Sequence, residues 1–130
     1  MAGFSDYLED KVLDHVFGGV SYTAPATLYV ALYTVAPDDT GGGTEVSGGA
    51  YARQTATFTV SGTSPTTATN SAAIEYPTAT ANYGTGVAVG ILDASSAGNL
   101  LAYANLDTSK VVSSGDVFRF DAGDLDITLA

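Results

Sequence analysis

Few residues in this 130-residue sequence could carry out chemistry. His15 is the single histidine and cysteine is absent, which excludes two-histidine metal sites and thiolate nucleophiles. His15 falls in the Phe4–Leu8 sector of a predicted helix, where partial burial or an interaction with the helix C-terminus is favoured over catalysis. No Gly-x-Ser-x-Gly motif supplies a nucleophile. The sequence therefore predicts no catalytic residue and a protein that is not an enzyme.

Acidic residues near the C-terminus could in principle bind Ca²⁺ through their oxygen atoms. They are Asp116, Asp121, Asp124 and Asp126. Their spacing does not match an EF-hand loop, and the last two alternate with apolar residues, which is typical of the solvated face of a strand. The glycine-rich segments Gly41–Gly43 and Gly84–Gly86 lack the lysine and the following helix of a phosphate loop. We therefore predict neither a metal site nor a cofactor.

Tyrosine is abundant, with eight residues, and could form a sugar-binding surface. Glutamate is represented only by Glu9, Glu45 and Glu75, and tryptophan is absent, which disfavours a glycosidase. Four tyrosines occupy predicted strands, where packing explains them better: Tyr29, Tyr33, Tyr76 and Tyr103. A glycan-binding module stays open as an alternative function.

The charge balance bounds the possible partners. Four basic residues stand against fourteen acidic ones, for a formal net charge of -10. The basic residues are Lys11, Arg53, Lys110 and Arg119, which are too scattered to form a basic patch. Residues 1–17 lack the basic region and the cleavage site expected of a secretory signal, and the sequence contains no apolar run of the ~18 residues that a membrane span needs. We expect neither nucleic acid nor membrane as a partner.

One helix is predicted from about Ser5 to Phe17, with Asp6 as a possible N-cap and Gly18–Gly19 as the stop. On a helical wheel Leu13 and Phe17 lie away from the main apolar stripe, so the helix has two apolar flanks and needs two contacts. We predict a docking helix whose subunit-interface residues are Phe4, Leu8, Val12, Leu13, Val16 and Phe17.

After Gly19 the hydrophobic period changes from 3.6 to 2, which predicts strands. We expect strands near residues 28–33, 55–60, 72–76, 87–92, 100–106, 111–112, 117–120 and 125–129. The predicted fold is mainly β: a single domain over residues 1–130, in which residues 26–130 form an antiparallel β-sandwich or jelly roll of about seven or eight strands behind one N-terminal α-helix. The predicted loops are Gly41–Gly49 and Gly62–Thr69, and Glu45, Tyr51 and Arg53 are expected on an exposed loop.

Five segments carry a resemblance to a known family. They read LDHVFGG (Leu13 to Gly19), ATLYVALYT (Ala26 to Thr34), GGTEVSGGAYAR (Gly42 to Arg53), GILDASSAGNLL (Gly90 to Leu101) and SGDVFRFDAGDLDITL (Ser114 to Leu129). With these segments the chain resembles small structural proteins of tailed bacteriophages, which are tail-fibre-like or virion decoration proteins. The resemblance implies a non-enzymatic virion protein. We expect it to be assembled in the host cytoplasm and to form a dimer or trimer, with the major capsid protein or tail proteins of the same virion as partners.

The length of the chain favours a decoration protein over a complete fibre. The chain lacks coiled-coil heptads and a long shaft sequence, which a complete fibre needs. We therefore expect a capsid decoration (cement) protein that stabilises the head through the Ser5–Phe17 helix. The alternative is a tail, baseplate or tail-fibre component whose glycine-rich loops contact a host receptor.

Overall fold

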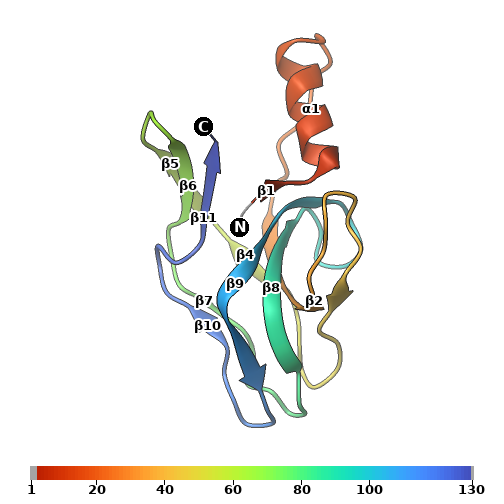
Figure 1. The fold of residues 1–130 in the computed structure, drawn as a ribbon, viewed down its shortest axis with the longest axis vertical. Coiled ribbons are helices and arrows are strands. Elements are labelled where there is room, and N and C mark those ends of the chain that lie inside the picture. Colours follow the sequence, from red (N-terminus) through yellow and green to blue (C-terminus); the bar gives the residue numbers. More distant parts are fainter. Residues whose placement is uncertain (1–2, 130) are drawn as a thin grey trace.

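The computed structural model describes residues 3–129, which form one α-helix and eleven β-strands (Figure 1). The helix is α1 (Asp6–Val16). The strands are β1 (Gly3–Phe4), β2 (Leu28–Val35), β3 (Thr44–Glu45), β4 (Gln54–Ala56), β5 (Phe58–Ser61), β6 (Thr66–Asn70), β7 (Ile74–Glu75), β8 (Gly84–Leu92), β9 (Leu100–Val112), β10 (Arg119–Phe120) and β11 (Asp126–Leu129). All strand pairings are antiparallel within the described residues. The expectation of a mainly β, antiparallel fold with one helix near the N-terminus is confirmed.

The largest sheet has six strands in the order β1-β9-β8-β2-β3, and β4 also pairs with β2. Its centre is the β8–β9 hairpin beside β2, in which Val30 pairs with Ile91 and Gly90 pairs with Tyr103. The alternation of large apolar residues in these segments predicted the three strands, because each second side chain must face a core.

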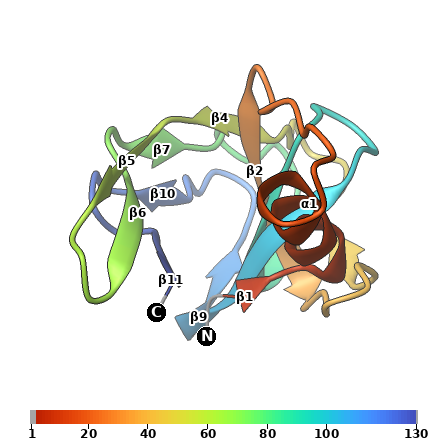
Figure 2. The same cartoon turned by 90° about the horizontal axis from the view of Figure 1, so that it is seen from above.

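Two smaller sheets, β10-β7 and β11-β6-β5, lie across from the main sheet (Figure 2). The core lies between the main sheet and the two smaller sheets. It consists of aliphatic residues of the main sheet and a group of aromatic rings. Tyr76 stands at its centre: its ring stacks on Tyr51 at 5.8 Å between centroids, and its hydroxyl donates to the Val30 carbonyl oxygen at 2.8 Å. Phe118 meets Tyr76 edge-on at 5.9 Å. The hydrogen bond allows a phenol to be buried at the centre of the core without an unsatisfied polar atom.

The opposite face of the main sheet carries a smaller buried cluster of Ala31, Tyr33, Ala88 and Leu92. Gly90 lies beside it in the middle of β8. A Cβ atom on Gly90 would lie 2.8 Å from both Tyr33 Cε1 and Leu100 Cδ1. The absence of a side chain at Gly90 therefore provides the space in which the Tyr33 ring packs against the sheet.

The number and bounds of the strands differ from the sequence-based expectation. The predicted strand at residues 55–60 is two strands, because the chain leaves the main sheet at Thr57 and β5 joins β6 instead. Residues 66–70 form β6, although a loop was predicted there, and residues 100–112 form one long strand rather than two. Thr-rich β6 has little hydrophobic signal of its own and is held by pairing with β5 and β11.

Buried Asn70 fixes the end of β6. Its Nδ2 atom donates to the carbonyl oxygens of Ala72 and Asp121, and its Oδ1 atom accepts from the amides of Gly123 and Leu125. These four bonds use the full capacity of the side-chain amide. They hold the segment before β11 against the end of β6.

No helix among residues 3–129 is long and apolar enough to cross a membrane.

Candidate functional site

The Glu45–Tyr51–Arg53 cluster joins three residues that the sequence analysis expected on an exposed loop. The Arg53 guanidinium donates to both Glu45 carboxylate oxygens, from Nε at 2.9 Å and from Nη2 at 2.8 Å. The Tyr51 hydroxyl donates to Glu45 Oε2 at 2.7 Å and accepts from the Leu32 amide at 3.0 Å. Leu32 lies on β2 between the residues that pair with β4 and the residues that pair with β3. The Tyr51 hydroxyl therefore satisfies a β2 amide where no strand does so.

Arg53 also ties the cluster to the β8–β9 turn. Its Nη1 atom donates to the carbonyl oxygens of Ala94 and Ala97 at 2.8 and 2.9 Å. The Arg53 side chain is only 8% exposed and that of Glu45 is 25% exposed. These side chains are therefore less exposed than expected for an exposed loop. Their polar groups bond to other groups of the same chain. The cluster is built to hold two loops together.

The electrostatics of the cluster fix its charges near neutral pH. Partial burial alone would raise the pKa of the Glu45 carboxyl, but hydrogen bonds from Arg53 and Tyr51 and the charge of Arg53 outweigh it, so the pKa lies below its usual value. The hydrogen bond to Glu45 raises the pKa of Arg53. Burial, reinforced by the bond to Glu45, raises the pKa of the Tyr51 phenol. Near neutral pH, Glu45 and Arg53 therefore both stay charged and the Tyr51 phenol stays protonated.

The N-terminal end of α1 is anchored to the body of the protein. Ser5 is the N-cap, one residue before the expected Asp6, and its Oγ atom accepts from the Leu8 amide and donates to the Leu100 carbonyl oxygen. The Ser5 amide donates to the Leu101 carbonyl oxygen and the Asp6 amide to that of Asp39. Ser5, a residue only 1% exposed, is the better cap because its side chain bonds both Leu8 of the helix and Leu100 of β9.

The C-terminal end of α1 projects away from the body (Figure 1). Of the predicted interface residues, Phe4, Leu8 and Val12 are half-buried against the chain itself. Leu13, Val16 and Phe17 are exposed, with 58%, 62% and 82% of their surface accessible. We call these three residues the apolar helix end. The structure thus divides the predicted interface into a part that packs internally and a part that is free for a partner.

His15 lies beside the apolar helix end and is exposed, so the expected partial burial was wrong. A helical wheel puts His15 in the same sector as Phe4 and Leu8. His15 is nevertheless exposed, because it lies near the end of α1 that projects away from the sheets. Its Nδ1 atom accepts a hydrogen bond from the Tyr22 amide at 3.0 Å. The histidine holds the segment that follows the helix.

The acidic residues near the C-terminus each make local contacts. Asp116 accepts from the Ser113 amide, Asp121 from Arg119 Nε, Asp124 from the Asp121 amide and Asp126 from Thr69 Oγ1. No group of three or more potential metal-ligating side chains gathers within residues 3–129. These carboxylates shape turns and hairpins on a solvated surface.

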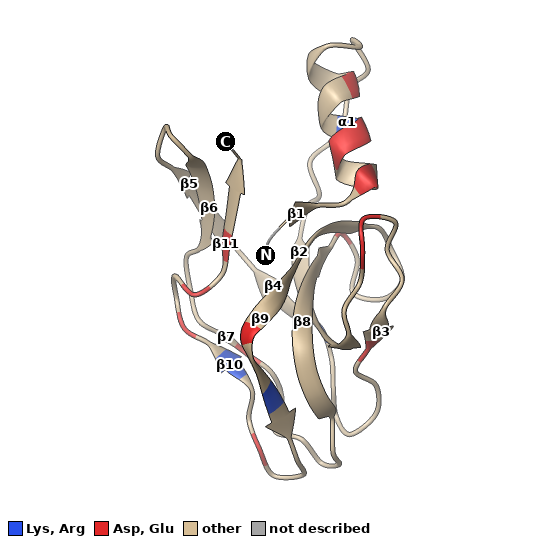
Figure 3. Ribbon diagram, viewed as in Figure 1, with Lys and Arg blue, Asp and Glu red and all other residues tan. Residues whose placement is uncertain are grey.

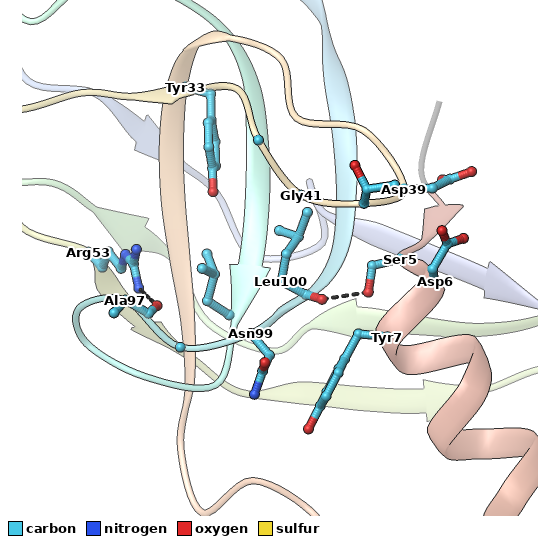
Figure 4. A pocket seen from close by; sticks show the side chains of 14 residues that line it. Ser5, Asp6, Tyr7, Tyr33, Asp39, Gly41, Arg53, Ala97, Asn99 and Leu100 are labelled. Atoms are coloured by element: carbon cyan, nitrogen blue, oxygen red, sulfur yellow. Dashed lines mark hydrogen bonds between the residues drawn. The ribbon is translucent and has the colours of Figure 1, made fainter.

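A cavity of ≈ 550 Å³ lies where the start of α1, the Asp39–Gly42 loop and the β8–β9 turn meet (Figure 4). In Figure 4 the Tyr33 ring points into this space from one side, and Tyr7 and Asn99 lie on the other. The sequence pattern does not predict the cavity, because its walls come from segments that are far apart along the chain. Gly90 was the one available signal, since a glycine inside a strand marks the close approach of another group.

The fold and the family comparison together define a β-rich structural protein of a phage virion. The model of a family described as podophage GP4 fiber I protein gp80 matches residues 3–128, so the chain belongs to that family. Among curated proteins, none matches the sequence significantly. The resemblance to small structural proteins of tailed phages is confirmed, and the chain is a virion component that associates with other virion components.

Proposed function

We propose that this protein is a non-enzymatic component of a tail fibre and that it attaches to another virion protein through the apolar helix end. Membership of a phage fiber family over residues 3–128 supports the tail alternative. It lends no support to capsid decoration, the role first expected from the size of the chain. The observation that carries the attachment is the exposure of Leu13, Val16 and Phe17 on a projecting helix.

The helix needs a covering partner for a physical reason. It has 11 residues and none of them is buried. Helices of this length are only marginally stable in water without tertiary contacts. The anchored first turn positions α1, and a partner that covers its far end would supply the missing apolar burial. Leu13, Val16 and Phe17 follow the i, i+3, i+4 spacing of a helix that docks into a groove.

Charge favours a different protein over a second copy of this chain as the occupant. Acidic residues outnumber the single Lys11 along α1 (Figure 3). They are Asp6, Glu9, Asp10 and Asp14. Two such helices packed together would bring like charges close, which costs free energy. We therefore propose an apolar groove with a basic rim on another tail protein; a dimer or trimer of this chain would form through a different surface.

Electron microscopy of intact virions tests this function. Gold-labelled antibody against the chain should decorate the tail and leave the head bare. Antibody against the major capsid protein serves as the control for access to the head. Gold spread over the head would overturn the proposed role in the tail and restore capsid decoration.

A further inference from the structure

The floor of the cavity beside α1 is built mostly from buried side chains. Tyr33, Leu92 and Leu100 line it. The Tyr33 ring packs beside Gly90, which provides space that any larger side chain would take. Because Tyr33 and Leu92 are each only 5% exposed, the aromatic side chain that can meet the apolar face of a ring-shaped ligand is the half-buried Tyr7 of α1.

The polar groups of the cavity include several that are free to bond a ligand. Tyr33 is only 5% exposed, and its hydroxyl makes no hydrogen bond within residues 3–129. In the same part of the chain, no fully buried side-chain oxygen or nitrogen lacks a partner. The Tyr33 hydroxyl must therefore be accessible, and the cavity is the space that it lines.

Asn99 is held in place at the rim. Its backbone amide donates to Asp93 Oδ1 at 2.7 Å, and its Nδ2 atom donates to Asp93 Oδ2 at 3.0 Å. These bonds orient the side-chain amide and leave its oxygen available as an acceptor. Tyr7 from α1 adds a second aromatic side chain to the wall.

The charges around the cavity disfavour an anion. Asp6 and Asp39 are exposed at the rim, and Asp39 accepts from the Tyr103 hydroxyl. Arg53, the cationic residue among those lining the cavity, is paired with Glu45 and two carbonyl oxygens. The helix N-terminus is also occupied, because Ser5 caps it. Ligand hydroxyls that donate to the carboxylates are favoured, and phosphate or carboxylate groups are repelled.

We propose that this cavity binds a neutral sugar residue, with the sugar ring against Tyr7 and its hydroxyls bonded to the Tyr33 hydroxyl, Asn99 and the rim carboxylates. The proposal rests on the function proposed above, in which the chain is part of a tail fibre. It assigns receptor contact to this cavity, in which Gly41 and Gly42 of the first glycine-rich loop take part, and not to the Gly62–Thr69 segment.

Amide chemical shifts of the ¹⁵N-labelled full chain test the proposal. The probes are methyl glycosides of glucose, galactose, mannose, rhamnose and N-acetylglucosamine, with methyl glucuronide as an anionic comparison. At least one neutral glycoside should cause saturable shifts at Tyr7, Gly41 and Asn99, and methyl glucuronide should bind more weakly. Absence of saturable shifts with all five neutral probes, or shifts confined to another surface, would overturn it.

Two variants make the result specific. Tyr7→Ala removes part of the wall and should weaken binding at least about fivefold. Tyr29→Ala is the matched control, because Tyr29 is half-buried on the same strand as Tyr33 but does not line the cavity. Equal affinity in both variants would contradict the assignment. Gold on the tail without sugar binding would refute the cavity proposal alone, whereas sugar binding with gold on the head would refute the tail function alone.

Discussion

The Glu45–Tyr51–Arg53 cluster and the apolar helix end differ in both side-chain chemistry and exposure. The cluster contains a carboxylate and a guanidinium, yet the Arg53 side chain is 8% exposed. The helix end is apolar, yet Phe17 is 82% exposed. Enclosed charge is stable only when it is fully paired, and exposed apolar surface is favourable only when a partner covers it. The difference suggests that the charged cluster serves the fold and the helix end serves assembly.

The largest loss of stability is expected from Arg53→Leu. The substitution removes the cation that pairs with the Glu45 carboxylate and the donor to the carbonyl oxygens of Ala94 and Ala97, so that Glu45 keeps only its bond from Tyr51. Breaking such a buried pair should lower the free energy of unfolding by about 3 kcal/mol, measured by urea denaturation. Arg119→Leu is the matched control, because Arg119 also contacts two carboxylates but is 50% exposed, and it should cost less than about 1 kcal/mol. Equal costs would contradict the structural role of the cluster.

Tyr51→Phe should have the next largest effect. It removes one hydroxyl that bonds both the Leu32 amide and Glu45. We expect a loss of about 1–2 kcal/mol in the same denaturation experiment, because a buried β2 amide is left unsatisfied. Tyr29→Phe should change stability by less than about 0.5 kcal/mol. If the two phenylalanine variants were equally stable, the Tyr51 bond to β2 would have no importance for the fold.

Acid should weaken the cluster in a defined pH range. The pKa of Glu45 is lowered in the folded chain, so the carboxylate contributes stability above its unfolded pKa of about 4.3. That contribution is lost as the pH falls through the lower, folded pKa. Glu45→Gln should therefore be less stable than the wild type at pH 7 and show a shallower loss of stability below about pH 4. Parallel stability curves for the two proteins between pH 7 and pH 3 would exclude this account.

The smallest effect on stability is expected at the helix end. Leu13→Ser combined with Phe17→Ser should change the free energy of unfolding by less than about 0.5 kcal/mol, because both side chains are exposed. Leu8→Ser combined with Val12→Ser provides the contrast on the same helix, since these residues are half-buried and should cost more. A large loss in the first variant would mean that the helix end stabilises the isolated chain.

The sequence predicted those parts of the fold that depend on local periodicity. Leu28, Val30 and Leu32 alternate as a strand must, and Gly19 has the positive φ that ends the helix region. The pairing of β6 could not be predicted in this way, because Thr67 and Thr69 carry no apolar signal. It depends on β5 and β11, and β11 is far away in the sequence.

The candidate sites were predictable only in part. A helical wheel identified Leu13 and Phe17 as a separate flank, but a wheel does not tell where along its axis a helix leaves the body. Arg53 was expected on an exposed loop because its carbonyl partners are 41 and 44 residues away in the sequence. The cavity wall likewise joins residues from distant segments of the chain.

The most direct test is the amount of the Leu13→Ser/Phe17→Ser chain in purified virions, measured by quantitative mass spectrometry against the wild-type chain. The account predicts a protein that folds normally in isolation and is lost from the virion, while the Arg119→Leu control is incorporated at the wild-type level. Incorporation of the helix-end variant at that same level would contradict attachment through α1.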